Sequence, residues 1–392
     1  MKRRSYRVYA LAIVLMVLGL ALQEILISGH LPFSQFVSIH VDAHSGLSVK
    51  IGYQPDYGGR DLHASAEVRM MRPNFQTGMI FPQWGTDAYS ANDKNWQIGL
   101  KDIQEQTGAH WIELPINLFQ SSITSTQVFT SQLTPTPDAV AAGIRAAHTR
   151  KLHVFVVPLL TVEQPGVLSW SGSIQFSTEQ QAEVWFDSYW LALEPYIQAA
   201  AEAGAEQLTI GTELEKLQLA SPTLWNQLIE RVHSIYPGLL TYDMNWSSLY
   251  LPMPSWMKNP YLSAIGVSEY IPLTDTEQRL DPSVIPGLWK EKVGAELDAF
   301  ATTLGKSVFI SEIGYRNSVY ALYRPWERDA IVEAFPLDPE EQAAAYDGAL
   351  ADTIADPHIS GIYFWAWSVP LFQPNWLPAS KVLYKWYTSY LA

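Results

Sequence analysis

From residue 76 onward, the chain alternates short runs rich in β-branched and aromatic residues with longer amphipathic stretches. The short runs have the length and composition of strands, and the longer stretches repeat apolar positions at helical spacing. We predict strands at 77–82, 111–115, 153–158, 207–211, 240–244, 264–267, 307–310 and 361–365. Such an alternation is typical of βα units around a parallel sheet.

The stretches between these runs carry residues that typically begin and end helices. We predict helices at 137–150, 178–203, 222–236, 291–304 and 340–355. Proline stands early in two of them and glycine directly follows two others, as helix termini favour. Eight strands with helices between them predict one (β/α)8 TIM barrel, a single catalytic domain over residues 76–392. A doubly wound open sheet is the alternative, but its first strand normally runs into a glycine-rich phosphate loop, which is absent here.

The first 29 residues have the form of a secretory signal. Lys2, Arg3, Arg4 and Arg7 precede an apolar run over residues 8–22, and no clear small-x-small cleavage site follows. We therefore favour an uncleaved signal anchor over a cleaved signal peptide. The basic flank would stay inside, which places the rest of the chain outside the cell membrane. Residues 30–75 show no sustained periodicity and are predicted to be a spacer with one or two extended segments.

Composition narrows the choice of partners. Hydrophobic residues make up 48% of the chain, so a large core is possible, and the formal net charge of −14 argues against binding of nucleic acid. The 12% of aromatic residues fits either a large core or surfaces that stack on sugar rings. There is no cysteine, and the nine histidines are dispersed, so we expect neither disulfides nor a metal site.

Two glutamates stand where predicted strands end. Glu213 follows the fourth strand in TIGTEL, and Glu312 follows the seventh in VFISEIG. Chemistry in a (β/α)8 barrel gathers at the carboxyl ends of the strands, so we expect the two side chains to face each other across the barrel mouth. Such a pair suits glycosidic bond cleavage. One carboxyl group donates a proton to the leaving oxygen, and the other attacks the anomeric carbon or activates water.

Other strand ends supply groups that can bind a substrate. Tyr270 follows the sixth strand and can hydrogen-bond the nucleophile. The remaining candidates are Asn245 and Trp246 after the fifth strand, Tyr315 after the seventh, and Trp365 and Trp367 at the end of the eighth. Each aromatic residue alone can equally be a rim residue packed on its neighbours. Their joint occurrence at one face favours sugar binding.

Four further acids lie close to these positions. We expect Glu215 to begin the helix after the fourth strand and to face solvent. Asp243 and Glu269 are candidate hydrogen-bond partners of a substrate. Glu113 lies inside the second strand, and an inward-facing side chain there would need a partner such as Arg or Lys.

The motifs and their order resemble glycoside hydrolase family 113. The resemblance extends from about residue 78 to residue 367. It rests on TGAHWIELPINLFQ, TPTPDAVAAGIRAAH, WSGSIQF, VWFDSYW, AGAEQLTIGTELEKL, LTYDMNWSS, IGVSEYIPL, ISEIGYR, RPW and GIYFWAW. It implies a retaining (β/α)8 glycosidase of clan A, with Glu213 as acid/base and Glu312 as nucleophile. It also implies that Tyr270 steadies the nucleophile.

The same resemblance implies roles for the aromatic candidates and a substrate. Trp365 or Trp367 would floor the subsite of the scissile sugar, and the Asn245-Trp246 pair would line the same cleft. Characterised members of the family cut β-1,4-mannans internally and need no cofactor. We therefore expect an endo-β-1,4-mannanase that acts as a monomer on a polysaccharide or oligosaccharide. The third strand departs from many relatives, because it ends in Val-Pro-Leu at 157–159 where they carry a Lys-Pro-His type of sequence.

Two other functions remain compatible with these residues. A transglycosylase would share the carboxyl pair and differ only in the acceptor that intercepts the glycosyl-enzyme. A non-catalytic carbohydrate-binding protein of the cell envelope could also be built on the same barrel, since a fold alone does not establish an activity.

Overall fold

The computed structural model describes residues 35–42, 46–53, 74–164, 170–328 and 335–389. The chain divides into two compact units, Met1–His63 and Ala64–Ala392. In the first unit, β1 (Gln35–Asp42) and β2 (Gly46–Tyr53) form an antiparallel pair within the segment expected to be a spacer. The predicted signal anchor lies outside the described residues. Within the described ranges, no helix combines the length and the apolar character that a bilayer crossing requires.

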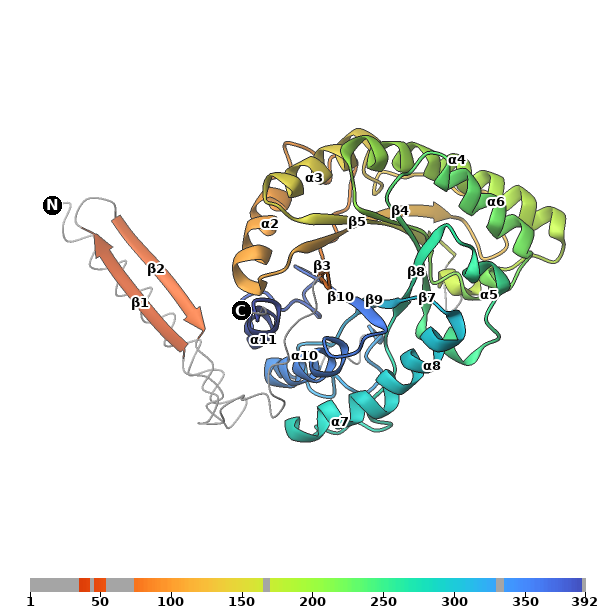
Figure 1. Ribbon diagram of the computed structural model, residues 1–392. Coiled ribbons are helices and arrows are strands. Elements are labelled where there is room, and N and C mark those ends of the chain that lie inside the picture. Colours follow the sequence, from red (N-terminus) through yellow and green to blue (C-terminus); the bar gives the residue numbers. More distant parts are fainter. Residues whose placement is uncertain (1–34, 43–45, 54–73, 165–169, 329–334, 390–392) are drawn as a thin grey trace. The chain divides into compact units, whose positions relative to one another are not determined.

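Eight parallel strands of the second unit close into a barrel (Figure 1). They are β3 (Gln76–Ile80), β4 (Trp111–Gln120), β5 (His153–Val162), β6 (Gln207–Thr212), β7 (Leu239–Asn245), β8 (Leu262–Ser268), β9 (Val308–Ile313) and β10 (Ile359–Phe364). Each predicted strand is present, and the differences lie at the strand ends. Because β10 pairs with β3 and closes the ring, the alternative of an open doubly wound sheet is excluded.

Helices surround the barrel (Figure 1). They are α2 (Lys94–Thr107), α3 (Pro137–Thr149), α4 (Glu179–Ala203), α5 (Glu215–Gln218), α6 (Pro222–His233), α7 (Ile285–Trp289), α8 (Ala295–Leu304), α10 (Pro339–Thr353) and α11 (Pro378–Tyr387). Short 3-10 turns occupy Ser171–Ser173, Trp246–Tyr250, Ser255–Lys258 and Pro282–Val284. The helix expected at 291–304 instead comprises a π-helical segment, Lys290–Gly294, followed by α8.

Capping explains several helix boundaries. The hydroxyl groups of Thr136 and Thr178 accept hydrogen bonds from backbone N–H groups in the first turns of α3 and α4. Gly204 and Gly305 end α4 and α8 with left-handed φ angles of 80° and 72°, which glycine adopts without steric cost. The two glycines are the helix-ending signals on which the sequence prediction relied.

The barrel interior has an apolar part and a polar part. An inner apolar cluster, separate from the layer between strands and helices, includes Ile80, Phe155, Phe309 and Tyr363. Small polar residues are buried on the strands β6 to β9 instead, namely Thr209, Thr241, Asp243, Ser268 and Ser311. Gly266 makes room for this set, because a Cβ atom there would lie 2.3 Å from the Asp243 Oδ1 atom. The polar part therefore lies on the strands that carry the two predicted catalytic glutamates.

Candidate active site

A cavity of about 810 Å³ lies at the carboxyl ends of β6 to β9. Its lining residues are Trp170, Glu213, Asn245, Trp246, Ser247, Tyr270, Glu312, Trp326, Glu327 and Arg328. Five of the eight site residues predicted from the sequence are among them: both glutamates, Tyr270, Asn245 and Trp246. The structure thus brings residues from four strand ends to one cavity.

Glu213 follows β6 directly, and its backbone N–H donates to the Asp243 carbonyl oxygen at 2.8 Å. Its φ angle is +54°, a conformation that costs a non-glycine residue energy and that clusters at functional sites. Its Oε2 atom accepts a hydrogen bond from Trp170 Nε1 at 2.9 Å. Burial raises the pKa of Glu213, while the Trp170 N–H and the charge of Arg328 act in the opposite direction. Burial therefore favours the protonated form that a general acid needs.

Glu312 lies in β9 at a shift in the strand register, where Ser268 of β8 pairs with it. Its Oε1 atom accepts a hydrogen bond from Tyr270 Oη at 2.5 Å, which is the contact that the sequence predicted. Burial and the charge of Glu213 raise the pKa of Glu312 to about 7, and the bond from Tyr270 opposes this rise. A hydroxyl group that donates to a carboxylate stabilises its ionised form. The two glutamates therefore have different donors and different electrostatic surroundings.

Asn245 and Ser247 connect the cavity to the start of α5. The Asn245 Nδ2 atom donates to Ser247 Oγ at 2.6 Å, and Ser247 Oγ in turn donates to Glu215 Oε2. Glu215 begins α5 as expected, but it is only partly exposed and also accepts from Ser248 at 3.4 Å. The expectation that Glu215 faces solvent is therefore wrong, because the turn after β7 packs its hydroxyl and amide groups against this carboxylate.

Tryptophans from loops complete the cavity. The rings of Trp246 and Trp326 stack with their centroids 5.6 Å apart and their planes at 29°. Trp170 and Trp326 are 38% and 40% exposed, so part of each indole is open to solvent or ligand. Together with Arg328, these two residues were not singled out from the sequence. The only signals for them were two motifs of the family resemblance, WSGSIQF, which begins with Trp170, and RPW, which ends with Trp326.

Three predicted residues are not among the lining residues of this cavity. Trp365 is 5% exposed and belongs to the inner apolar cluster, under the guanidinium group of Arg328. Tyr315 and Trp367 belong to the outer apolar layer instead, between the strands and the helices. The Tyr315 Oη atom accepts from Trp289 Nε1 at 3.1 Å, and Trp367 lines a different hollow. The structure therefore does not place Tyr315 or Trp367 at this cavity. Tyr315 follows Glu312 by three residues, an odd spacing that puts the two side chains on opposite faces of an extended segment.

Three other acids, Glu113, Asp243 and Glu269, are sealed from solvent. Each is at most 2% exposed, and each has one carboxyl oxygen without a hydrogen-bond partner among the described residues. Burial raises the pKa of all three, for Glu269 to about 8. No Arg or Lys in the described part of the chain forms an ion pair with Glu113, which corrects the expectation of such a partner. Burial thus disfavours the charged form of each of these carboxyl groups.

One group within the described ranges has the composition of a metal site. It consists of Asp298, Asp356 and His358, with His358 Nδ1 at 2.7 Å from Asp298 Oδ1. It lies where β10 begins, whereas the cavity lies where strands end. Exposed ion pairs of this kind are common on protein surfaces.

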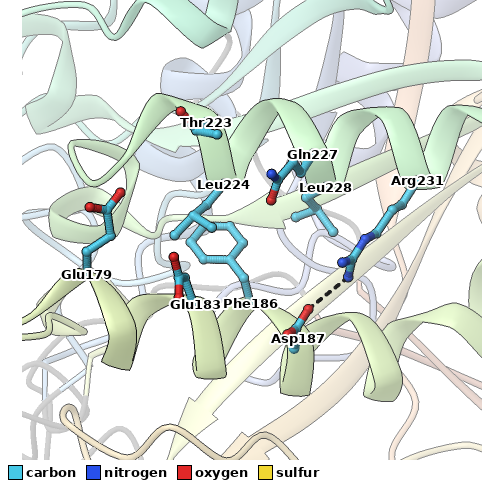
Figure 2. Close-up of a pocket in the computed structure, with 9 residues that line it drawn as sticks. All are labelled: Glu179, Glu183, Phe186, Asp187, Thr223, Leu224, Gln227, Leu228 and Arg231. Atoms are coloured by element: carbon cyan, nitrogen blue, oxygen red, sulfur yellow. Dashed lines mark hydrogen bonds and ion pairs between the residues drawn. The ribbon is translucent and has the colours of Figure 1, made fainter.

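A second hollow, of about 260 Å³, lies on the outside of the barrel between α4 and α6 (Figure 2). Figure 2 shows Glu179, Glu183 and Asp187 along α4, with Arg231 of α6 paired to Asp187 at 3.0 Å. Both members of this pair are solvent-exposed, and such pairs contribute little. The hollow contains none of the residues that the sequence predicts for catalysis.

Comparisons with known proteins identify the family of this chain. The family model described as Glycoside Hydrolase Family 113 matches residues 82–388. The structure of the family 113 β-mannanase AaManA from Alicyclobacillus acidocaldarius, in complex with ManMIm, matches with a TM-score of 0.68 at 21% identity. That match covers 81% of this chain and 98% of that chain.

Two further comparisons bear on the fold. A structure of a family 113 β-1,4-mannanase gives a TM-score of 0.67 at 20% identity, covering 81% of this chain and all of that chain (100%). A family 2 β-galacturonidase from Eisenbergiella tayi gives 0.51 at 11% identity, covering 91% and 55%. A comparison with curated proteins gives no match. Since the family model spans most of the barrel unit and more than half of the chain, the protein belongs to glycoside hydrolase family 113 and is a glycosidase.

Proposed function

We propose that the protein is a retaining β-mannanase that cuts internal β-1,4-linkages by double displacement. One observation carries this proposal. In a single cavity, Glu312 accepts a hydrogen bond from Tyr270, and Glu213 accepts one from Trp170. Because a phenol and an indole hold the two carboxyl groups separately, each can take a different role in one reaction.

In the first step, Glu312 is the nucleophile. Its carboxylate oxygen forms a bond to the anomeric carbon while the glycosidic C–O bond breaks, and Glu213 gives its proton to the leaving oxygen. Tyr270 orients the attacking carboxylate and favours its ionised form before attack. Glu213 begins protonated, in keeping with the rise of its pKa on burial.

In the second step, Glu213 is a carboxylate and acts as a base. It takes a proton from water, whose oxygen attacks the anomeric carbon as the bond to Glu312 breaks. The negative charges of the two glutamates repel each other, as the effect of Glu213 on the pKa of Glu312 indicates, and esterification of Glu312 removes this repulsion. The acid/base therefore loses affinity for a proton at the stage where it must be ionised.

The choice of mannan rests on the family and on the mannanases among the similar structures. The cavity is compatible with a neutral sugar chain. Trp170, Trp246 and Trp326 offer aromatic surface for sugar rings, and Asn245 and Ser247 offer polar groups for hydroxyls. The acidic character of the chain also disfavours a polyanionic substrate.

The test is hydrolysis by the full-length protein of β-1,4-mannan, mannohexaose, and matched β-glucan, xylan and chitin oligosaccharides. We expect release of internal fragments from mannan, and Glu213→Ala and Glu312→Ala should each lower the rate by at least about a thousandfold. Glu269→Gln is the matched control, because this buried glutamate lies outside the cavity lining and the variant should turn over like the wild type. Rapid hydrolysis by either alanine variant would contradict the mechanism. Cleavage of another polymer in preference to mannan would contradict the substrate.

We further propose that residues 1–29 anchor the protein in the cell membrane with the barrel outside. The support is the basic start followed by the apolar run over residues 8–22. Protease added to intact spheroplasts should digest the barrel while the first residues stay with the membrane. Protection of the barrel until the cells are lysed would contradict this placement.

A further inference from the structure

Arg328 reaches the cavity from the loop after β9. It is one of the lining residues, and its guanidinium carbon lies 5.0 Å from the centroid of Trp365 and 5.3 Å from that of Phe372. Both aromatic side chains belong to the inner apolar cluster of the barrel. Cation–π contacts with two rigid rings stabilise one position of the guanidinium group relative to the strands.

A second arginine shapes the loop that carries Arg328. Arg316 is fully buried, and its guanidinium group donates to the backbone carbonyl oxygens of Arg324 at 2.6 Å and of Tyr320 and Tyr323 at 2.9 Å. These bonds go to the backbone, so they define the path of the chain whatever side chains the loop bears. They hold the segment that leads directly to Trp326 and Arg328.

The charges in the cavity are otherwise negative. Glu213, Glu312 and Glu327 line it, and Arg328 is the one Lys or Arg in the lining that the structure describes. No acid of the described residues lies within ion-pair distance of Arg328, whereas Arg231 and Arg279 each pair with an aspartate. The charge of Arg328 is thus not neutralised by an ion pair with a described residue, and its field acts on all the carboxyl groups that line the cavity.

We propose that Arg328 is a positioning residue that acts through the two catalytic glutamates, and that its charge moves the pH range of activity to lower values. The inference rests on the proposed function, because it assumes that Glu312 attacks as a carboxylate and Glu213 donates a proton. A cation that faces two carboxyl groups favours the ionised form of both. The acidic and basic limbs of the profile of kcat/KM against pH should therefore move in the same direction.

The surroundings of Glu312 agree with this assignment. Burial and Glu213 raise its pKa, while Tyr270 and Arg328 oppose the rise. Asp243 and Glu113 also face it from β7 and β4, and burial raises the pKa of both, which disfavours their charged forms. Among the groups that oppose the rise, Arg328 is thus the one with a full positive charge.

The experiment measures kcat/KM against pH for the full-length wild type, Arg328→Gln, Arg328→Lys and Arg324→Gln. Arg324 is the matched control: it lies in the same loop, is exposed, contacts Tyr323 at 5.1 Å, and does not line the cavity. For Arg328→Gln we expect both limbs of the bell-shaped profile to move up by about one pH unit. Arg328→Lys should keep most of the wild-type position, and Arg324→Gln all of it.

Other results would overturn the inference. If Arg328→Gln lowers kcat/KM at every pH with both limbs in place, the residue binds substrate or supports the loop, and it does not set the pH range. Failure of the wild type to hydrolyse mannan would contradict the proposed function only. In that case, ¹³C NMR titration of the labelled glutamate carboxyl groups tests the inference without substrate. Unchanged titration of Glu213 and Glu312 in Arg328→Gln would refute it.

Discussion

The carboxyl groups near the barrel mouth fall into two sets. Glu213 and Glu312 line an open cavity, and each accepts a hydrogen bond from an aromatic N–H or O–H group. Glu113, Asp243 and Glu269 are sealed, and one oxygen of each lacks a partner among the described residues. Burial raises the pKa in both sets. A shifted pKa therefore does not identify the catalytic pair here, whereas access to the cavity and a dedicated donor do.

The sealed set is tolerated because a neutral carboxyl group costs much less to bury than a charged one. Asp243 fits against the backbone at Gly266, where any side chain would collide with it. Its own backbone carbonyl accepts the N–H of Glu213, so this strand end supports Glu213 through its main chain. The sealed acids are thus part of the scaffold, whereas Glu213 and Glu312 are open to the cavity.

The largest effect is expected from Glu213→Gln, which keeps the shape of the side chain and removes its proton. We expect a loss of about a thousandfold, or about 4 kcal/mol of transition-state stabilisation, on mannan. On a mannoside with a nitrophenolate leaving group, formation of the glycosyl-enzyme should be much less impaired, since that group leaves without protonation. Steady-state and pre-steady-state release of nitrophenol measures the difference. Equal losses on both substrates would show that Glu213 is not the general acid.

A smaller effect is expected from Tyr270→Phe, which leaves Glu312 without its hydroxyl donor. We expect a 10- to 100-fold lower kcat/KM, or about 1.4–2.7 kcal/mol, because a hydrogen bond to a charged group is lost. The pKa of Glu312 should rise further, so the acidic limb of the pH profile should move to higher pH. A profile with an unchanged acidic limb would mean that Tyr270 does not act on the nucleophile.

The last prediction concerns folding stability instead of turnover, and it applies to the sealed set. The folded-state pKa of Glu269 is about 8, above its ordinary value of 4.5, so the folded protein binds this proton more tightly than the unfolded chain. Its contribution to stability is present below pH 4.5 and is lost as pH rises toward 8, by up to about 1.4 kcal/mol per pH unit. Glu269→Gln should remove this slope with little change in turnover. Urea unfolding at pH 5 and pH 8 checks it, and a slope that persists in the variant would contradict it.

The strands and the two glutamates of the cavity, Glu213 and Glu312, could be predicted because each is marked by a local pattern in the sequence. Runs of β-branched residues gave all eight strands, and Glu213 and Glu312 stand directly at the ends of two of them. Tyr270 was found for the same reason. The barrel then places strand ends together, so short-range patterns sufficed for the core of the site.

The rest of the site depends on loops and on side-chain direction. Trp170 and Arg328 lie in irregular segments, where no periodicity says which residue returns to the barrel mouth. Tyr315 and Trp367 were misplaced because the pattern shows where a strand ends but not which face each following residue takes. An inward-facing Glu113 was expected to need a cationic partner, whereas in the structure burial raises its pKa and so disfavours the charge that would need one.

The central claim is that Glu312 is the nucleophile, and trapping the glycosyl-enzyme tests it most directly. A 2-deoxy-2-fluoro-mannosyl fluoride slows both steps but keeps a good leaving group, so the covalent intermediate should accumulate. Mass spectrometry of the digested protein should then find one fluoromannosyl group on the peptide that contains Glu312. A label on another residue, or no label from an enzyme that hydrolyses mannan, would contradict the account.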